Sequence, residues 1–495
     1  MIIEVVTVLS MVVGGSALMR ITGIRGWALP IVGSVAGISL YLVVGMLQVF
    51  TPITTSPVVT ISLTAGLPLA AVAWQALRGA DVGVRIIPSV ATVLGVVAAV
   101  ALFRQARLVA WSKDSFEYLV NASLIANNHL DAASLDLLPK RLIGVPLLHA
   151  AANLGGEHYL PAITPLIAGL TIAVIVWLAW VALAPRIDHR IAAVVIVSCL
   201  LALVTVNRYV FNAFYVNGHL LFGMLIVVLV GCGWLIATKT EVNRAALITL
   251  MALSIVALSV IRAEAPIAVA LALLPVLLNQ EFSVRERSLL LGLFGISTIA
   301  WQSFVAIMYV AGDSRVPVSV LGLLALGIAA LGGVPLLRLK LLTRKRSIFL
   351  VSAQALLWVA LAILAMRQPD VLIDSLRATV DNAVLGAGSW GYSLLLLGIV
   401  VAVALFAKLP RGEMMRFPIV TFIPVAFLLA YLREAAYRVG AGDSLNRMWI
   451  QLLPLAVFYL IIAIGMGRRR LVASDSLDER RVAPGISAQA NPSVI

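Results

Sequence analysis

The sequence has 495 residues, of which 62% are hydrophobic and only 12% are charged, and its mean hydropathy is +1.07. A soluble globular chain carries about 25% charged and about 45–50% apolar residues, so a water-soluble fold is excluded. Apolar runs of about 20 residues, the length that an α-helix needs to cross a bilayer, follow one another almost to the end. The sequence therefore predicts an all-α polytopic membrane protein.

The positions of the charges predict how this protein is oriented. About 15 apolar spans can be drawn, with a range of 13–15, because 245–260 and 265–278 are short and are either a hairpin or one broken helix. If the odd-numbered links face the cytoplasm, they hold 23 of the 36 basic and nine of the 22 acidic residues. The whole net charge of +14 then lies on that side, as the positive-inside rule requires. We expect the N-terminus outside, without a cleavable signal, and the C-terminus in the cytoplasm.

Three regions are expected along the chain. Residues 1–77 form a three-helix membrane unit, and residues 78–466 form the main transmembrane module. This module has an outer loop, 104–159, which is too long to be only a connector. It also has an outer segment, 370–392, whose amphipathic pattern suits a helix in the membrane interface, either inert or acting as a lid. Residues 467–495 are polar and are expected to be a disordered cytoplasmic tail.

The outer loop begins with a candidate helix rich in polar groups. Asp114, Glu117, Tyr118 and Asn121 are spaced at i, i+3, i+4 and i+7, so on a helix they share one face. Two carboxylates, a phenol and an amide would then project together beside the membrane. Spacing alone leaves two interpretations open, a functional site or a solvated helix face with a Lys113–Glu117 pair.

Other outer links also carry charge. Arg208 and His219 lie in one polar link, Arg262 and Glu264 lie between two short apolar runs, and Arg447 precedes the last span. Charges at the edge of a membrane are costly unless they are paired or used. Each one alone is more simply an interfacial anchor, but the three arginines together could bind a phosphate.

With these features the chain resembles the GT-C glycosyltransferases, which are membrane enzymes that use polyprenyl-phosphate sugars. The resemblance rests on the acidic outer loop at 111–118 and the basic–Gly–Pro pattern at 140–146, together with the motifs at 262–266 and 447–454. The chain departs from the family in placing the acidic loop after the fourth span instead of the first, so residues 1–77 resemble an added unit. Its loop acids are also separated instead of adjacent.

The resemblance implies transfer of a sugar from a polyprenyl-phosphate donor to a glycan, lipid or protein acceptor of the cell envelope, on the outer face of the plasma membrane. Asp114 is the expected general base, since it matches the acidic position of the loop. Glu117 would orient it, bind the acceptor or help to hold a divalent ion, and Asp131 and Asp136 are reserves. The remaining expected roles are donor phosphate binding by Lys113, Arg208, Arg262 and Arg447, and support or acceptor binding by Tyr118, Asn121, His219 and Glu264.

The last expectations from the sequence concern cofactors, partners and the alternative function. No metal motif is present, and a divalent cation, Mg²⁺ or Mn²⁺, is left open as a cofactor. The basic chain reflects membrane orientation, so no nucleic-acid partner is expected. Of the 36 basic residues, 30 are arginine, which is typical of a GC-rich bacterial genome. The alternative function is a transporter or flippase for a lipid-linked or small polar substrate, although a transporter usually buries ionisable groups near mid-membrane.

Overall fold

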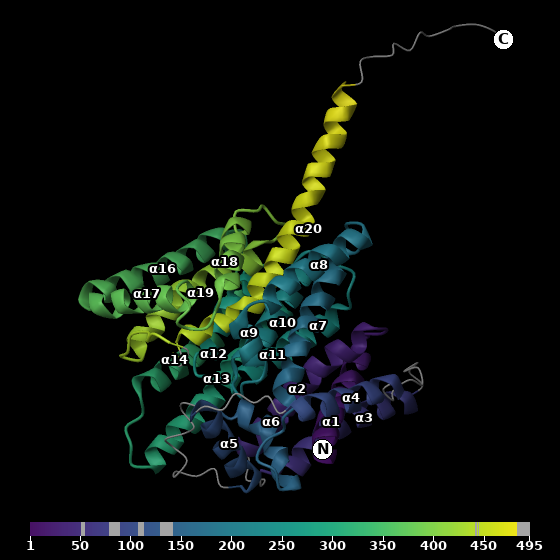
Figure 1. Cartoon of the computed structure of the whole chain (residues 1–495), viewed down its shortest axis with the longest axis vertical. Helices are drawn as coiled ribbons and strands as arrows, with labels where there is room; N and C mark the ends of the chain where they lie inside the picture. Colours follow the sequence, from purple (N-terminus) through teal and green to yellow (C-terminus); the bar gives the residue numbers. More distant parts are fainter. Residues whose placement is uncertain are drawn as a thin grey trace, which may run out of the picture.

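The computed structural model describes residues 1–50, 55–78, 90–106, 113–128, 142–440, 443 and 445–482. These residues form helices and turns, with no strand among them. The helices gather into one bundle from which the last helix projects (Figure 1). The α-helices are α1 (Ile2–Ile21), α2 (Ala28–Phe50), α3 (Pro57–Leu77), α4 (Val90–Ala106), α5 (Lys113–Ala126), α6 (Gly144–Ala150), α7 (Ile163–Leu183), α8 (His189–Val204), α9 (Asn207–Ala213), α10 (His219–Ala237), α11 (Arg244–Leu258), α12 (Ala265–Leu277), α13 (Val284–Ala311), α14 (Val318–Gly333), α15 (Lys340–Arg344), α16 (Arg346–Arg367), α17 (Pro369–Ala383), α18 (Tyr392–Ala404), α19 (Glu413–Leu432) and α20 (Trp449–Val482). Short 3₁₀ helices lie at η2 (Ala151–Gly155), η3 (Pro335–Arg338) and η4 (Asn446–Met448).

The lengths of these helices confirm a multi-pass membrane architecture. Ten helical segments in the described part are long and apolar enough to cross a membrane, and α8 with α9 would be an eleventh if this pair, bent by 80°, is one span. Helices α4, α11, α12 and α18 are apolar but shorter. A helix therefore lies at each predicted apolar run, whereas the structure supports only ten or eleven full spans. A count of about 15 crossings stays a prediction.

The short pair α11 and α12 is a hairpin. Arg244, at the start of α11, pairs with Glu286 at 2.6 Å, and Arg287 donates to the carbonyl of Leu277, at the end of α12. The start of α11 and the end of α12 therefore lie at the same end of the bundle, which excludes one broken helix. Arg262 and Glu264 lie at the tip of this hairpin.

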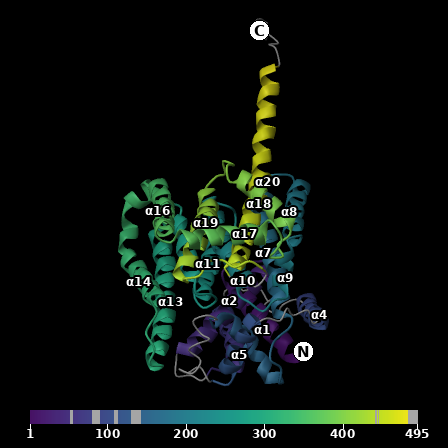
Figure 2. The same cartoon turned by 60° about the vertical axis from the view of Figure 1, so that its left-hand side comes forward.

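Helix α10 is the centre of the bundle. All of its residues are buried, and it contacts α7, α11, α12 and α20. By contrast, α14 and α16 lie at one edge (Figure 2). Few of the residues in these two helices are buried. This difference suits a protein whose outer helices face lipid, because the bilayer can cover apolar side chains that water cannot.

Small residues bring α1 and α2 into close contact. Gly33 and Gly37 of α2 form a Gly-x-x-x-Gly spacing against Gly15 of α1, and a Cβ atom at any of the three would overlap the backbone of the partner helix. Such spacings let membrane helices approach closely. At the N-terminal end of α1, Glu4 accepts a hydrogen bond from the backbone of Ala162 at 2.6 Å and one from Arg104 at 3.2 Å. The N-terminal unit is therefore joined to the main module.

Contacts between links show which of them share a side. The links at 239–244, 279–287, 338–346 and 408–413, all predicted to be cytoplasmic, are brought together at one end. Their ion pairs are Lys239–Glu281 at 3.2 Å, Arg411–Glu281 at 3.4 Å, Arg244–Glu286 at 2.6 Å and Arg346–Glu413 at 3.1 Å. The structure agrees with the predicted alternation of the links, and which end faces the cytoplasm stays a prediction.

Two regions differ from the sequence-based expectation. Helix α20 continues to Val482, so residues 467–482 of the expected disordered tail are helical, while 483–495 lie outside the described residues. The reason is compositional, because residues 468–482 contain no proline or glycine and many good helix formers. In segment 370–392, which was predicted to lie in the membrane interface, Trp390 is buried within the protein, whereas Tyr392 is exposed.

The predicted amphipathic helix is present as α17. Ile373, Leu376 and Val380 are exposed along one side, as expected for contact with the membrane interface. The other side is fastened to the chain after α19. Asn382 donates to the carbonyl of Arg438 at 2.8 Å and accepts from the backbone of Gly440 at 2.6 Å.

Candidate functional site

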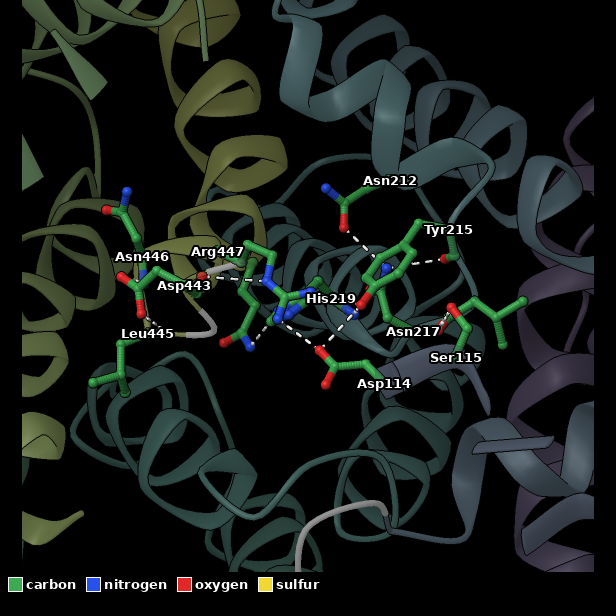
Figure 3. Close-up of polar contacts among 12 residues, drawn as sticks. Asp114, Ser115, Asn212, Tyr215, Asn217, His219, Asp443, Leu445, Asn446 and Arg447 are labelled. Carbon is green, nitrogen blue, oxygen red and sulfur yellow. Dashed lines mark hydrogen bonds and ion pairs between the residues drawn. The ribbon is translucent and has the colours of Figure 1, made fainter. Parts of the chain in front are cut away.

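The end of the bundle opposite the basic links holds a buried polar cluster (Figure 3). Its centre is a triangle of Asp114, Tyr215 and Arg447, which come from α5, the link before α10, and η4. Arg447 Nη2 donates to Asp114 Oδ2 at 2.6 Å, and its Nη1 donates to the Tyr215 hydroxyl at 2.7 Å. The Tyr215 hydroxyl in turn donates to Asp114 Oδ2 at 3.0 Å. Two donors therefore converge on one carboxylate oxygen.

Helix α5 positions Asp114 through its buried side. Ser115 donates to the carbonyl of Val216 at 3.3 Å, and Tyr118 packs with Val145 and Val216. Asp114 lies in the first turn, where the helix dipole favours a negative charge. The predicted helix is confirmed. The Asp114 side chain is 25% exposed, so it remains accessible to a reactant.

Arg447 is held by the turn that precedes α20. Its Nε donates to the carbonyl of Asp443 at 3.2 Å. The Asp443 carboxylate accepts hydrogen bonds from the backbone of Leu445 and Asn446, at 3.2 Å and 3.0 Å. Burial raises the pKa of Asp443 above its ordinary value, although these backbone hydrogen bonds and the charge of Arg447 act in the opposite direction. The turn thus fixes the direction in which the Arg447 guanidinium points.

A second set of contacts surrounds the hairpin tip. Arg262 Nε donates to Glu264 Oε1 at 2.5 Å, and Arg433 Nη2 lies 3.7 Å from Glu264 Oε2. Gln451 Nε2 donates to Glu264 Oε1 at 2.9 Å and lies 3.2 Å from His219 Nδ1. The Glu264 carboxylate thus connects Arg262 and Arg433 to Gln451 in the first turn of α20. Through Gln451 it is also linked to His219 in the first turn of α10.

The charge state of Glu264 follows from these partners. Burial by itself would raise the pKa of Glu264, but the charges of Arg262 and Arg433 and the hydrogen bond from Gln451 outweigh it and lower the pKa to about 2. The carboxylate is therefore ionised at neutral pH, and the hairpin tip is a fixed ion pair.

The arginines of the cluster lie close enough to act together. Arg208, Arg262, Arg433 and Arg447 all lie within electrostatic range of the His219 imidazole. Arg208 is buried on α9, and its guanidinium is 4.6 Å from the centroid of the Phe211 ring. Arg262 is in turn within electrostatic range of Asp114 and Tyr118, which links the hairpin tip to α5. Four guanidinium groups against the three carboxylates Asp114, Glu264 and Asp443 leave a net positive site.

Close backbone packing supports this geometry. The backbone of Gly144 donates to the carbonyl of Val260 at 2.7 Å, and a Cβ atom at Gly144 would lie 2.8 Å from that oxygen. The glycine of the basic–Gly–Pro pattern therefore packs directly against the hairpin that carries Arg262. A side chain larger than hydrogen at this position would push the outer loop away from the hairpin tip.

The structure brings together many of the predicted site residues. Asp114, Tyr118, Arg208, His219, Arg262, Glu264 and Arg447 all belong to this cluster or lie within its electrostatic range. Asn121 is buried on α5, and Glu117 is half-buried one turn beyond Asp114, so their expected roles stay predictions. The Lys113 side chain, Asp131 and Asp136 lie outside the described residues.

Tyr215, Arg433, Asp443 and Gln451 belong to the cluster but were not predicted as site residues. The sequence could have pointed to Gln451 as a site residue, because it follows Arg447 by four residues and shares its helix face. Arg433 had none, since a lone arginine at the end of a span is indistinguishable from an interfacial anchor.

A divalent cation does not fit the cluster. Within the described part of the chain, no group of three or more histidine, cysteine, aspartate or glutamate side chains is arranged to hold a metal. Asp114 and Glu264 are instead paired with arginines.

The arrangement can bind an anion and accept a proton in one place. Buried arginines at the ends of membrane helices suit a phosphate at headgroup depth, and a carboxylate beside them suits proton transfer.

Comparisons of the chain with protein-family models, curated proteins and solved structures find no significant match.

Proposed function

We propose that this protein is a GT-C-type glycosyltransferase that moves a sugar from a polyprenyl-phosphate donor to a cell-envelope acceptor on the outer face of the plasma membrane. The observation that supports this most is the convergence of Asp114 with four arginines drawn from four separate parts of the chain. Segments up to 333 residues apart meet there, at one end of the bundle.

The donor's phosphate would bind among the arginines. Arg447 contacts Asp114 directly and lies within electrostatic range of Arg208, while Arg262 and Arg433 are braced by Glu264. A guanidinium can offer two parallel hydrogen bonds to a phosphate. The lipid tail of the donor would remain in the bilayer, because the cluster lies at the ends of α10, α12 and α20.

The transfer step uses Asp114 as general base. The acceptor hydroxyl oxygen attacks the anomeric carbon of the donor sugar, and the bond from that carbon to the phosphate oxygen breaks. The phosphate leaves with the bonding electron pair, and the arginines stabilise its negative charge. The proton of the acceptor hydroxyl passes to the Asp114 carboxylate, which the Tyr215 hydroxyl holds in position.

The direct test is a transfer assay. Purified protein in lipid nanodiscs is incubated with a panel of polyprenyl-phosphate sugars, and release of free polyprenyl phosphate is measured. We expect release with at least one donor from the wild type and a strong reduction in Asp114→Asn. If no donor reacts and vesicles containing the protein instead take up a lipid-linked or polar solute, the proposal is wrong and the transporter is favoured.

A further inference from the structure

A second candidate site lies away from the polar cluster, within the membrane-level part of α1, α2, α4 and α7. Together with Leu148 of α6, these helices line a cavity of about 310 Å³ that is open on one side. The residues that line it are almost all apolar, and the hydroxyl of its one serine, Ser34, is already bonded to the carbonyl of Pro30 at 2.6 Å. Apolar cavities of about 150 Å³ stay dry and accept apolar molecules, so water is not the expected occupant.

The cavity meets the lipid-facing surface at α7. Gly169 lines it and is exposed, and a Cβ atom at this glycine would meet no atom within 4 Å. Helix α7 is one of the candidate membrane spans. An opening beside a membrane-spanning helix faces the acyl chains of the lipids, so an acyl chain can enter the cavity without passing through water.

A cluster of charges adjoins the outer end of this cavity. Phe103, which lines it, is followed by Arg104, which pairs with Glu157 and lies 3.2 Å from Glu4. Ile163, which also lines the cavity, directly follows Ala162, whose backbone N–H donates to Glu4. The hydrogen bond from Arg104 lowers the pKa of Glu157, so this carboxylate is ionised.

We infer that the cavity holds one acyl chain of a membrane phospholipid whose headgroup carries an amine, of the ethanolamine class. The chain fills the apolar volume, and the headgroup lies beside Arg104 and Glu157. Glu4 and Glu157 are balanced by Arg104 and by the N-terminal ammonium, which lies within electrostatic range of both carboxylates. These described groups carry no net charge together, which suits a zwitterionic headgroup better than an anionic one. This inference does not depend on the proposed glycosyltransferase activity.

The test is native mass spectrometry of the full-length protein after gentle detergent extraction and incubation with phosphatidylethanolamine or phosphatidylglycerol. Gly169→Leu fills the cavity, and Ala173→Phe fills it from one turn further along α7. Gly322→Leu is the matched control, because Gly322 also lies in a candidate span with no atom within 4 Å of its Cβ position. Size-exclusion profiles identify any variant that is not folded.

We expect the wild type and Gly322→Leu to retain one phosphatidylethanolamine that both filling variants lose. Glu157→Gln should abolish the preference for phosphatidylethanolamine without emptying the cavity. Equal lipid retention by the wild type and both folded filling variants would overturn the site. Equal retention of the two lipids by the wild type would overturn the headgroup assignment.

Discussion

Replacing Asp114 by asparagine separates a catalytic role from a structural one. The substitution keeps the shape of the side chain and leaves an oxygen that can still accept from Arg447, but it removes the charge and the proton acceptor. Loss of a general base lowers turnover by about 10²–10⁴-fold. If Asp114 only holds Arg447 in place, the change instead costs stability, of the order of the 1.5–3 kcal/mol attributed to a charged hydrogen bond, and any transfer continues.

The same substitution should strengthen donor binding. In the structure Arg447 Nη2 is occupied by the Asp114 carboxylate at 2.6 Å, so a donor phosphate must compete with that carboxylate. Two unit negative charges about 6 Å apart at an effective dielectric constant of about 20 repel by about 3 kcal/mol. The Asp114 side chain is 25% exposed, and solvent reduces this figure. We therefore expect binding of polyprenyl phosphate to Asp114→Asn to be about tenfold tighter, which corresponds to about 1.4 kcal/mol.

The assay measures sugar transfer, affinity for polyprenyl phosphate by thermophoresis, and thermal unfolding on the same preparations. Asp374→Asn is a matched control, because Asp374 lies on α17, is 58% exposed and pairs with Arg377 only at 3.8 Å. We expect wild-type behaviour from it. Wild-type turnover in Asp114→Asn would refute the assignment of the base. Reduced turnover with weaker binding would show that Asp114 maintains the site instead of reacting in it.

Three further predictions follow from the same geometry. Arg262→Lys keeps the charge but loses the planar group that binds Glu264 and a phosphate together. Titration with polyprenyl phosphate should therefore show roughly tenfold weaker binding. An unchanged Kd would show that Arg262 and Glu264 form only a structural anchor. The pKa of Glu264 is lowered from 4.5 to about 2, so its contribution to stability is complete above about pH 5 and is lost as the pH falls from 4.5 toward 2. The melting temperature of the wild type should fall in this window more steeply than that of Glu264→Gln, and parallel curves would contradict this. A single cysteine at Asn127 should react with an impermeant thiol reagent on intact cells and one at Thr343 should not, while the native Cys199 and Cys232 are buried and give little background; labelling at Thr343 would show that the chain is inverted.

Local patterns in the sequence predicted the elements that carry the site. The spacing of Asp114, Glu117, Tyr118 and Asn121 predicted a helix, and α5 spans all four. Apolar runs located the helices of the bundle, because in a membrane the length and composition of a segment determine its structure almost alone. The number of full crossings was harder to predict, since runs of 13 to 17 residues have the composition of a span but not its length.

Pairing between distant segments could not be predicted. Asp114 and Arg447 are 333 residues apart, and no periodicity indicates that they form an ion pair. The choice between a hairpin and a broken helix at Arg262 was equally open, because both have the same apolar pattern. Contacts at the opposite end of α11 and α12 decide between them. Gln451 shows the same limit, since its helix face was predictable but its partners His219 and Glu264 were not.

The balance of charge in the cluster gives a reason for its internal pairing. Buried guanidinium groups are costly without counter-charges, so the acids must be present before any substrate arrives. Glu264 is permanently paired at the hairpin tip, whereas Asp114 is partly exposed and occupies Arg447 only through one oxygen. On the proposed mechanism, the donor phosphate takes over Arg447 and frees the Asp114 carboxylate to accept a proton. The base would then become available only when the donor is bound, so the donor should bind before the acceptor.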